Sequence, residues 1–84
     1  MDIKKLNVAR RRYWKILTET GDDCGWESSG GEEGVMNASL EDLLHDADCL
    51  RDNYIHNGLS KGDRGYEIEF KIMKKYERFI ERFS

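Results

Sequence analysis

The sequence predicts a small all-α domain: a helical hairpin and an N-terminal helix, interrupted by a long loop rich in glycine and acids. Three observations support this fold class. Proline is absent, apolar residues recur at helical spacing in three segments, and the eight glycines gather in two clusters between those segments. The 84 residues allow one domain over 1–84, and a chain of this length hides only about 60% of the surface that it exposes when unfolded. We therefore expect a thin core.

Residues 2–20 form the first predicted helix. At about 100° per residue their apolar side chains fall on one stripe, and most of their basic side chains gather on the other side. Asp2 can cap the first turn, and Gly21 can end the helix in a left-handed conformation.

Residues 21–38 are rich in glycine, serine and acids, and we expect them to form a long loop. Such a composition buries too little apolar surface to order itself, and connections of this length are usually functional or mobile. Trp26 stands alone in this stretch. Either it folds back as a lid on the core, or it is an exposed anchor for a partner, because tryptophan is enriched at binding hot spots.

Residues 39–57 form the best-defined predicted helix, and residues 63–83 form the third. Ser39 is the expected N-cap of the former, and Asn57-Gly58 is its expected stop. The third helix has an alternative, because strict apolar/polar alternation over 65–72 is typical of a strand and would make the fold α+β. Helix is the preferred interpretation, since a strand needs a mate and the sequence offers few candidates.

The predicted core joins the apolar stripes of the three helices. Its expected members are Leu6, Tyr13, Leu17, Leu40, Leu43, Leu44, Leu50, Tyr54, Ile72, Tyr76, Phe79, Ile80 and Phe83. Three further aromatic side chains, Trp14, Tyr66 and Phe70, lie at the edges of their stripes. A homodimer or burial against a partner would cover them.

Charge is strongly segregated along the chain, although the net charge is only −3. Residues 1–17 carry six Lys or Arg and one acid, residues 18–50 carry ten acids and no Lys or Arg, and residues 51–84 carry eight bases and six acids. In one interpretation the acidic middle faces the basic ends within the fold or is simply solvated. In the other, it is a surface offered to a basic partner, which would speed encounter and be weakened by salt.

No catalytic or metal-binding pattern is found in the sequence. His45 and Cys49 are one helical turn apart, but no C-x-x-C or H-x-x-x-H pair supports a zinc site. The serines and cysteines occur in no triad or nucleophile-elbow context, and the segment 30–34 lacks the Gly-Lys-Ser/Thr of a phosphate loop. We therefore expect no enzyme, no cofactor and no metal.

The sequence also bears on the compartment. No apolar run approaches the ~20 residues of a membrane span, and the N-terminus lacks the apolar stretch of a secretory signal. Two cysteines are too few for a disulfide scaffold. These features predict a cytoplasmic protein without a membrane partner.

We expect a small, non-catalytic acidic binding protein that acts by occupying a protein partner with a basic surface. Such a protein could be an inhibitor or regulator of a nucleic-acid-binding protein, with the general character of phage and mobile-element accessory proteins. The expected contact residues are Asp22, Asp23, Trp26, Glu27, Glu32, Glu33, Glu41, Asp42, Asp46 and Asp48. The alternative is a regulatory nucleic-acid-binding helical module that uses Arg10, Arg11, Arg12 and Lys15, against which the overall acidity of the chain argues.

Overall fold

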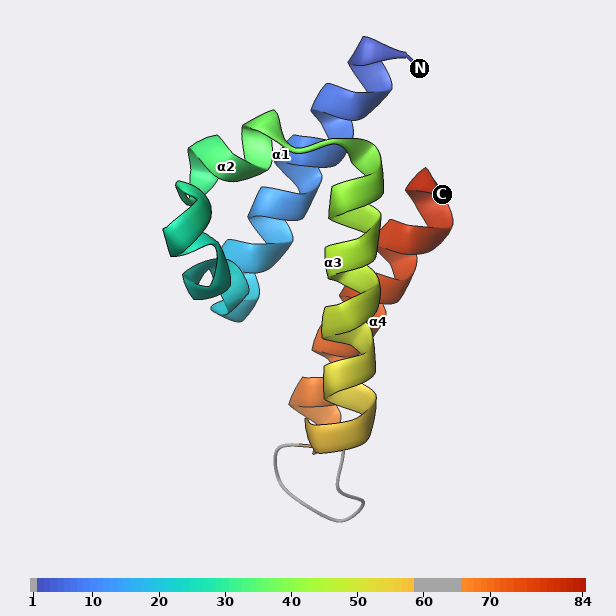
Figure 1. The fold of residues 1–84 in the computed structure, drawn as a ribbon. Coiled ribbons are helices and arrows are strands. Elements are labelled where there is room, and N and C mark those ends of the chain that lie inside the picture. The colour runs from blue at the N-terminus through green and yellow to red at the C-terminus, as the bar shows by residue number, and fades with distance from the viewer. Residues whose placement is uncertain (1, 59–65) are drawn as a thin grey trace.

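The computed structural model describes residues 2–58 and 66–84, and over these ranges the chain forms helices and no strand (Figure 1). The elements in chain order are α1 (Ile3–Thr20), the 3-10 helix η1 (Asp22–Ser29), α2 (Glu32–Asn37), α3 (Leu40–Asn53), the π-helical turn η2 (Tyr54–Gly58) and α4 (Tyr66–Phe83). The all-α prediction is confirmed. Within the described ranges no helix has the length and apolar content needed to cross a membrane.

The helices α3 and α4 pack side by side as the predicted hairpin, and α1 contacts both (Figure 1). On its other side α1 is covered by η1 and α2, so α1 lies between the hairpin and the segment that follows α1 in the chain. The caps explain where the long helices begin and end. Asp2 accepts a hydrogen bond from the backbone N–H of Lys4 at 2.9 Å, Gly21 adopts a left-handed φ of 82°, and Ser39 accepts from the N–H of Asp42 at 3.1 Å.

The core follows the predicted stripes. Of the expected members, the buried side chains are Tyr13, Leu17, Leu40, Leu43, Tyr76, Phe79 and Phe83. The others pack against this cluster while partly exposed: Leu6, Leu44, Leu50, Tyr54, Ile72 and Ile80. The buried residues that the prediction omitted are Ala9, Val35, Ala38, Ala47 and Met73. Of the stripe-edge aromatics, Trp14 is partly buried, Phe70 is 38% exposed, and the side chain of Tyr66 lies outside the described residues.

The segment 21–38, expected as a loop, instead folds into η1 and α2. Two apolar side chains order it, because Val35 is completely buried and Trp26 packs partly buried against the core. Gly30 and Gly31, both with positive φ, turn the chain sharply between η1 and α2. The composition of 21–38 does not predict these helices, because the burial of a few side chains decides whether the segment is ordered.

The second and third predicted helices also differ in detail from the structure. The predicted helix 39–57 ends as α-helix at Asn53 and continues as the wider turn η2. The strand alternative for 65–72 is wrong for residues 66–72, which belong to α4. Residues 59–65, including the predicted first turn of the third helix, lie outside the described residues.

Candidate functional site

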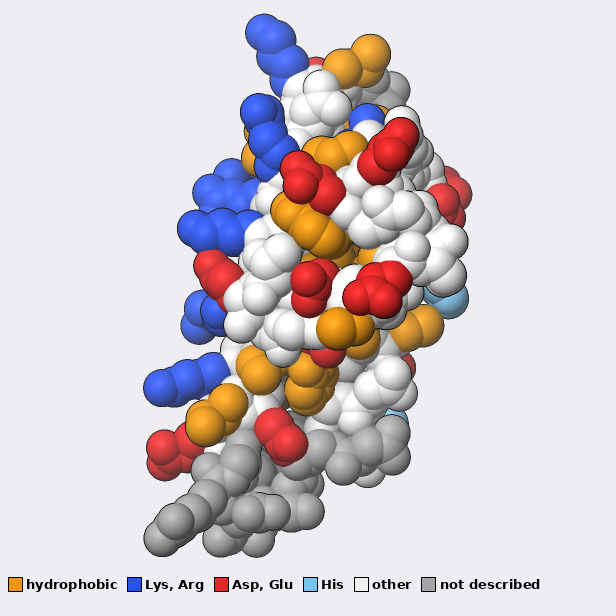
Figure 2. Space-filling view, turned by 90° about the vertical axis from the view of Figure 1, so that its left-hand side faces the viewer, with side chains coloured by type: hydrophobic (Ala, Val, Ile, Leu, Met, Phe, Trp, Pro, Cys, Tyr) orange, Lys and Arg blue, Asp and Glu red, His pale blue; other side chains and the backbone are white. Residues whose placement is uncertain are grey.

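The predicted contact residues lie on η1, α2 and α3, which bring them to one region of the surface. Figure 2 shows acidic side chains distributed over this face, with apolar side chains between them, whereas lysine and arginine gather along one edge. The acids fall into two groups, according to whether their carboxylates are used inside the fold.

Asp46 belongs to the first group, since its carboxylate is half-buried beneath η1. Its Oδ2 accepts hydrogen bonds from the Tyr13 hydroxyl and from the Trp26 indole Nε1, the latter at 3.1 Å. The Trp26 and Tyr13 rings meet edge to face, with centroids 6.5 Å apart. Trp26 is therefore fixed in orientation and covers the core, as the lid interpretation expected, and its ring remains partly exposed.

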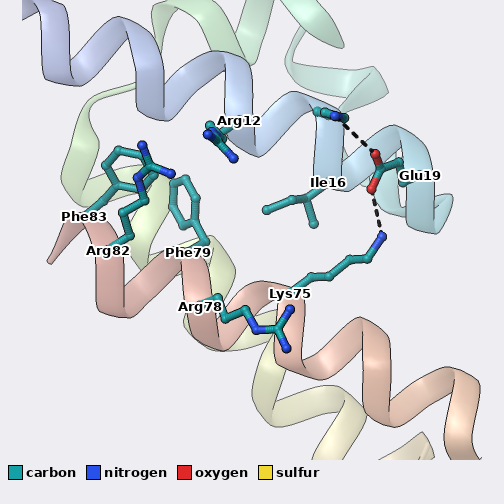
Figure 3. A pocket seen from close by; sticks show the side chains of 9 residues that line it. Arg12, Ile16, Glu19, Lys75, Arg78, Phe79, Arg82 and Phe83 are labelled. Carbon is teal, nitrogen blue, oxygen red and sulfur yellow. Dashed lines mark hydrogen bonds and ion pairs between the residues drawn. The ribbon is translucent and has the colours of Figure 1, made fainter.

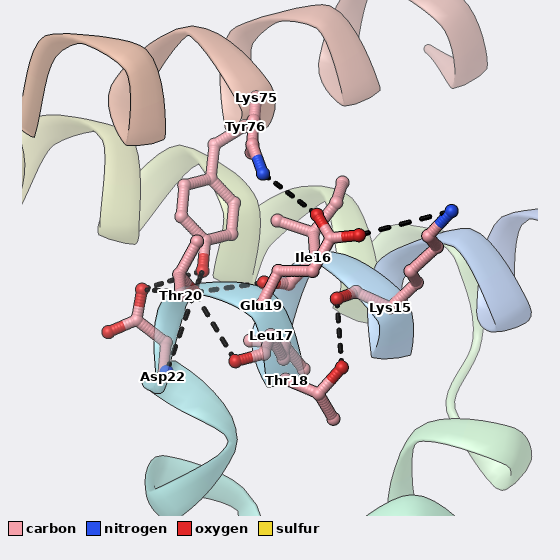
Figure 4. Close-up of polar contacts among 9 residues, drawn as sticks. All are labelled: Lys15, Ile16, Leu17, Thr18, Glu19, Thr20, Asp22, Lys75 and Tyr76. Atoms are coloured by element: carbon pink, nitrogen blue, oxygen red, sulfur yellow. Dashed lines mark hydrogen bonds and ion pairs between the residues drawn. The ribbon is translucent and has the colours of Figure 1, made fainter. Parts of the chain in front are cut away.

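Asp22 accepts a second set of hydrogen bonds from neutral donors at the start of η1. Its Oδ2 lies 2.6 Å from the Tyr76 hydroxyl and 2.9 Å from the Tyr54 hydroxyl. The Thr20 hydroxyl completes the set at 3.1 Å from the same oxygen (Figure 4). The bonds tie η1 to α4 and to η2, which are distant in sequence.

Burial and the two carboxylates together raise the pKa of the three tyrosines that donate to them. Desolvation is the largest cause at each of Tyr13, Tyr54 and Tyr76, followed by the hydrogen bond to Asp46 for Tyr13 and to Asp22 for the other two. These phenols therefore release their protons less readily in the folded protein than in water. Asp22 and Asp46 are thus satisfied without any lysine or arginine.

The second group of acids points to solvent. Glu27, Glu32, Glu33, Glu41 and Asp42 are exposed, and within residues 2–58 and 66–84 their carboxylates form no ion pair or hydrogen bond. The remaining predicted acids are half-buried. Of these, Asp48 pairs with Arg51, three residues further along α3, and Asp23 forms no ion pair among the described residues.

Part of this surface is concave. A hollow of about 540 Å³ opens between the η1–α2 segment and the start of α3; we call it the acidic hollow. Its lining residues are Trp26, Ser29, Gly30, Glu33, Gly34, Asn37, Ala38 and Asp42. Glu33 and Asp42 provide two carboxylates and Trp26 provides an aromatic surface. Carboxylates bind guanidinium and ammonium groups, and an indole face attracts the same cations.

The four basic residues of the alternative do not all lie on one surface. The Nε of Arg10 donates to the backbone oxygen of Ala38 at 2.9 Å, so this guanidinium fastens α1 to the α2–α3 connection. Arg11 is exposed next to Asn7 and Met36. Arg12 and Lys15 turn towards α4.

Sequence reasoning missed a site that those last two residues help to form. A groove of about 310 Å³ runs between α1 and α4; we call it the basic groove (Figure 3). Its lining residues are Arg12, Lys15, Ile16, Glu19, Lys75, Arg78, Phe79, Arg82 and Phe83. The available signal was the spacing of Lys71, Lys75, Arg78 and Arg82, which places these four residues on one line of a helix.

Glu19 is the one acid that lines the basic groove. Its carboxylate accepts from Lys75 Nζ at 2.8 Å and lies 3.9 Å from Lys15 Nζ (Figure 4). The hydrogen bond from Lys75 is the main reason that the pKa of Glu19 is lowered.

No metal site accompanies these surfaces in the part of the chain that the structure describes. The Cys49 Sγ lies 3.7 Å from His45 Nε2, and no group of three or more His, Cys, Asp or Glu residues there is arranged to hold a metal ion. Cys24 and Cys49 are free and exposed.

No protein-family model, curated protein or solved structure matches this chain.

Proposed function

We propose that the protein is a non-catalytic binding protein whose acidic hollow and surrounding carboxylates hold the basic surface of a protein partner. One observation carries this proposal. The exposed carboxylates around the hollow have no internal cation among the described residues, although the chain has 14 Lys and Arg. Within residues 2–58 and 66–84, the lysines and arginines form no ion pair with these carboxylates. The carboxylates therefore remain available to an external partner.

The arrangement suits a partner that presents arginine or lysine side chains. A cation entering the acidic hollow would meet Glu33 and Asp42 and could lie against the partly exposed ring of Trp26. The hydrogen bond to Asp46 holds this ring in place, so little conformational freedom is lost on binding. Glu27, Glu32 and Glu41 add long-range attraction, which raises the association rate and weakens with salt. A nucleic-acid-binding protein is a partner of this kind, and occupying its basic surface would inhibit it.

The alternative, a nucleic-acid-binding module formed by residues 10–12 and 15, has less support. Arg10 is engaged by Ala38, and Arg11 and Arg12 lie next to different hollows. These residues cannot act as one patch.

Affinity capture with a charge-reversal pair tests the proposal. Wild-type protein and the double variant Glu33→Lys/Asp42→Lys are immobilised and exposed to a host lysate. We expect the wild type to retain a basic protein that elutes at raised salt, and the variant to bind it at least about tenfold more weakly. The matched control is Glu67→Lys/Glu81→Lys, which changes net charge equally at two exposed positions on α4.

A direct titration gives a second readout. An arginine-rich peptide is added to the Trp14→Phe protein, in which Trp26 is the remaining tryptophan. We expect quenching of Trp26 fluorescence that the Glu33→Lys/Asp42→Lys change removes. Two results would show that the partner does not bind at the hollow. One is an equal loss of binding in the α4 control, and the other is unchanged capture by the Glu33→Lys/Asp42→Lys variant.

A further inference from the structure

Three arginines on two helices face the basic groove. Arg12 comes from α1, and Arg78 and Arg82 come from α4, on either side of Ile16 and Phe79 (Figure 3). All three are exposed, and none forms an ion pair with a carboxylate of residues 2–58 and 66–84. The guanidinium of Arg82 lies over the Phe83 ring, 5.3 Å from its centroid, which holds it at the rim. Unpaired cations that line the same groove repel one another, and a bound anion would relieve this repulsion.

The positive surface extends beyond the basic groove. A neighbouring hollow shares Arg82 and Phe83 with it and adds Lys4 and Lys5 from the first turn of α1, together with the N-cap Asp2. Figure 2 shows lysine and arginine side chains along one edge of the molecule, with acidic side chains between some of them. The cations therefore form an elongated track along α1 and α4, which suits a linear polyanion better than a single small anion.

The floor of the groove narrows the choice of ligand. Phe79 is 3% and Phe83 is 4% exposed, so neither ring offers an open face for stacking a base or for burying an apolar side chain of a peptide. Ile16 is partly exposed in the groove, and the polar groups around it are mostly arginine forks, which match phosphate oxygens. The geometry favours a ligand with dense and regular negative charge.

We propose that the basic groove binds the sugar-phosphate backbone of a nucleic acid without sequence preference. The proposal concerns a second surface and does not depend on the acidic hollow, with which the groove shares no residue. Glu19 limits affinity because its carboxylate occupies Lys15 and Lys75.

Fluorescence anisotropy with labelled duplex and single-stranded DNA of mixed sequence tests the proposal. We expect Arg12→Gln/Arg78→Gln/Arg82→Gln to weaken binding at least about tenfold and to reduce the salt slope by roughly 2–3, since each phosphate contact contributes about 0.7–0.9. Arg11→Gln is the matched single control for Arg12→Gln, because it removes one adjacent exposed arginine that lies outside the groove. Comparison of the two DNA forms shows which one the groove prefers.

Glu19→Gln supplies a gain-of-function test that misfolding cannot imitate. Loss of this carboxylate frees two lysines, and we expect DNA binding to tighten a few-fold. If the triple variant fails to fold by circular dichroism, the single variants Arg78→Gln and Arg82→Gln replace it.

Three results would overturn the proposal. They are undetectable DNA binding at low salt, equal weakening by Arg11→Gln and Arg12→Gln, and tighter groove-dependent binding of a glutamate-rich peptide or of phosphatidylserine vesicles than of DNA. The Glu33→Lys/Asp42→Lys protein should still bind DNA. Its result separates failure of this proposal from failure of the acidic hollow as a protein-binding site.

Discussion

Asp22 and Asp46 are acids whose partners are aromatic side chains and a threonine. A half-buried carboxylate needs hydrogen-bond donors, and here phenol, indole and hydroxyl groups supply them. Tyr13 shows how closely these bonds are tied to the core, because its side chain is completely buried and its hydroxyl donates to Asp46. Both carboxylates therefore act as structural connectors within the fold.

Removal of the Asp46 carboxylate should destabilise the fold. Asp46→Ala leaves the Tyr13 hydroxyl and the Trp26 indole N–H without their acceptor, and we expect the free energy of unfolding to fall by about 1–3 kcal/mol. Asp46→Asn keeps an acceptor oxygen and should cost less. Urea unfolding followed by tryptophan fluorescence measures both. Asp48→Ala, which breaks only a partly exposed pair between residues three apart on α3, should cost no more than about 1 kcal/mol; an equal loss in the two alanine variants would contradict this assignment.

At the scale of elements, the close approach of η1 and α2 depends on Gly34. A Cβ built on Gly34 would lie 2.2 Å from the backbone oxygen of Ser29, which cannot move aside as a flexible side chain can. The absence of a side chain thus lets α2 fold back on η1 and brings Val35 into the core. The acidic hollow is formed by the same contact.

Gly34→Ala should therefore disturb both stability and the hollow. We expect a loss of about 1–3 kcal/mol in the free energy of unfolding, as for other overpacked sites, and weaker peptide quenching of Trp26. Gly25→Ala is the control, because a Cβ there meets nothing within 4 Å and its φ is not positive. That control should be neutral or stabilise the protein by up to about 1 kcal/mol. Comparable unfolding midpoints for the two variants would refute the packing argument.

The sequence predicts the long helices well because their periodicity and caps are local. It does not predict η1 and α2, whose order comes from Trp26 reaching Asp46 and from Val35 entering a core formed by distant residues. The strand-like alternation at the start of α4 is misleading for a related reason, because sequence alone does not show which apolar residues face the core. Ile68 is 64% exposed, so the apolar residues of these first turns do not all face the core, and their alternation carries no strand pairing.

The candidate sites were predictable to different degrees. Glu33, Asp42 and Trp26 were identified from composition, but their meeting in one hollow depends on the fold of 21–38. The basic groove was missed because Arg12 and Arg78 are far apart in sequence and their helices become neighbours only in the folded chain. Counting charges along the sequence does not reveal a surface that combines residues from two distant segments.

At the scale of the whole molecule, the raised pKa values of three core tyrosines link folding to alkaline pH. Tyr13, Tyr54 and Tyr76 hold their protons more tightly when folded than at the ordinary phenol pKa of about 10. Their stabilisation is fully present below about pH 10 and is lost as pH rises above it, because the unfolded chain then releases protons that the folded chain retains.

We therefore expect the free energy of unfolding to fall steeply above about pH 10. Urea midpoints measured across the alkaline range, with tyrosinate absorbance recorded in parallel, check this expectation. The Tyr54→Phe variant should show a shallower decline, since one of the three shifted phenols is gone. Tyrosinate formation near the ordinary pKa while the protein remains folded would contradict it.

The use of neutral donors around Asp22 and Asp46 has an electrical consequence. The lysines and arginines of α1 and α4 are not paired with these two carboxylates in the folded protein. Negative charge therefore remains concentrated at the acidic hollow and positive charge along the basic groove. A body with a permanent dipole moment experiences a torque in the field of a charged neighbour. At physiological ionic strength salt screens this interaction beyond about 8 Å. Within that distance the torque orients the surface of opposite charge towards the neighbour before the two molecules come into contact.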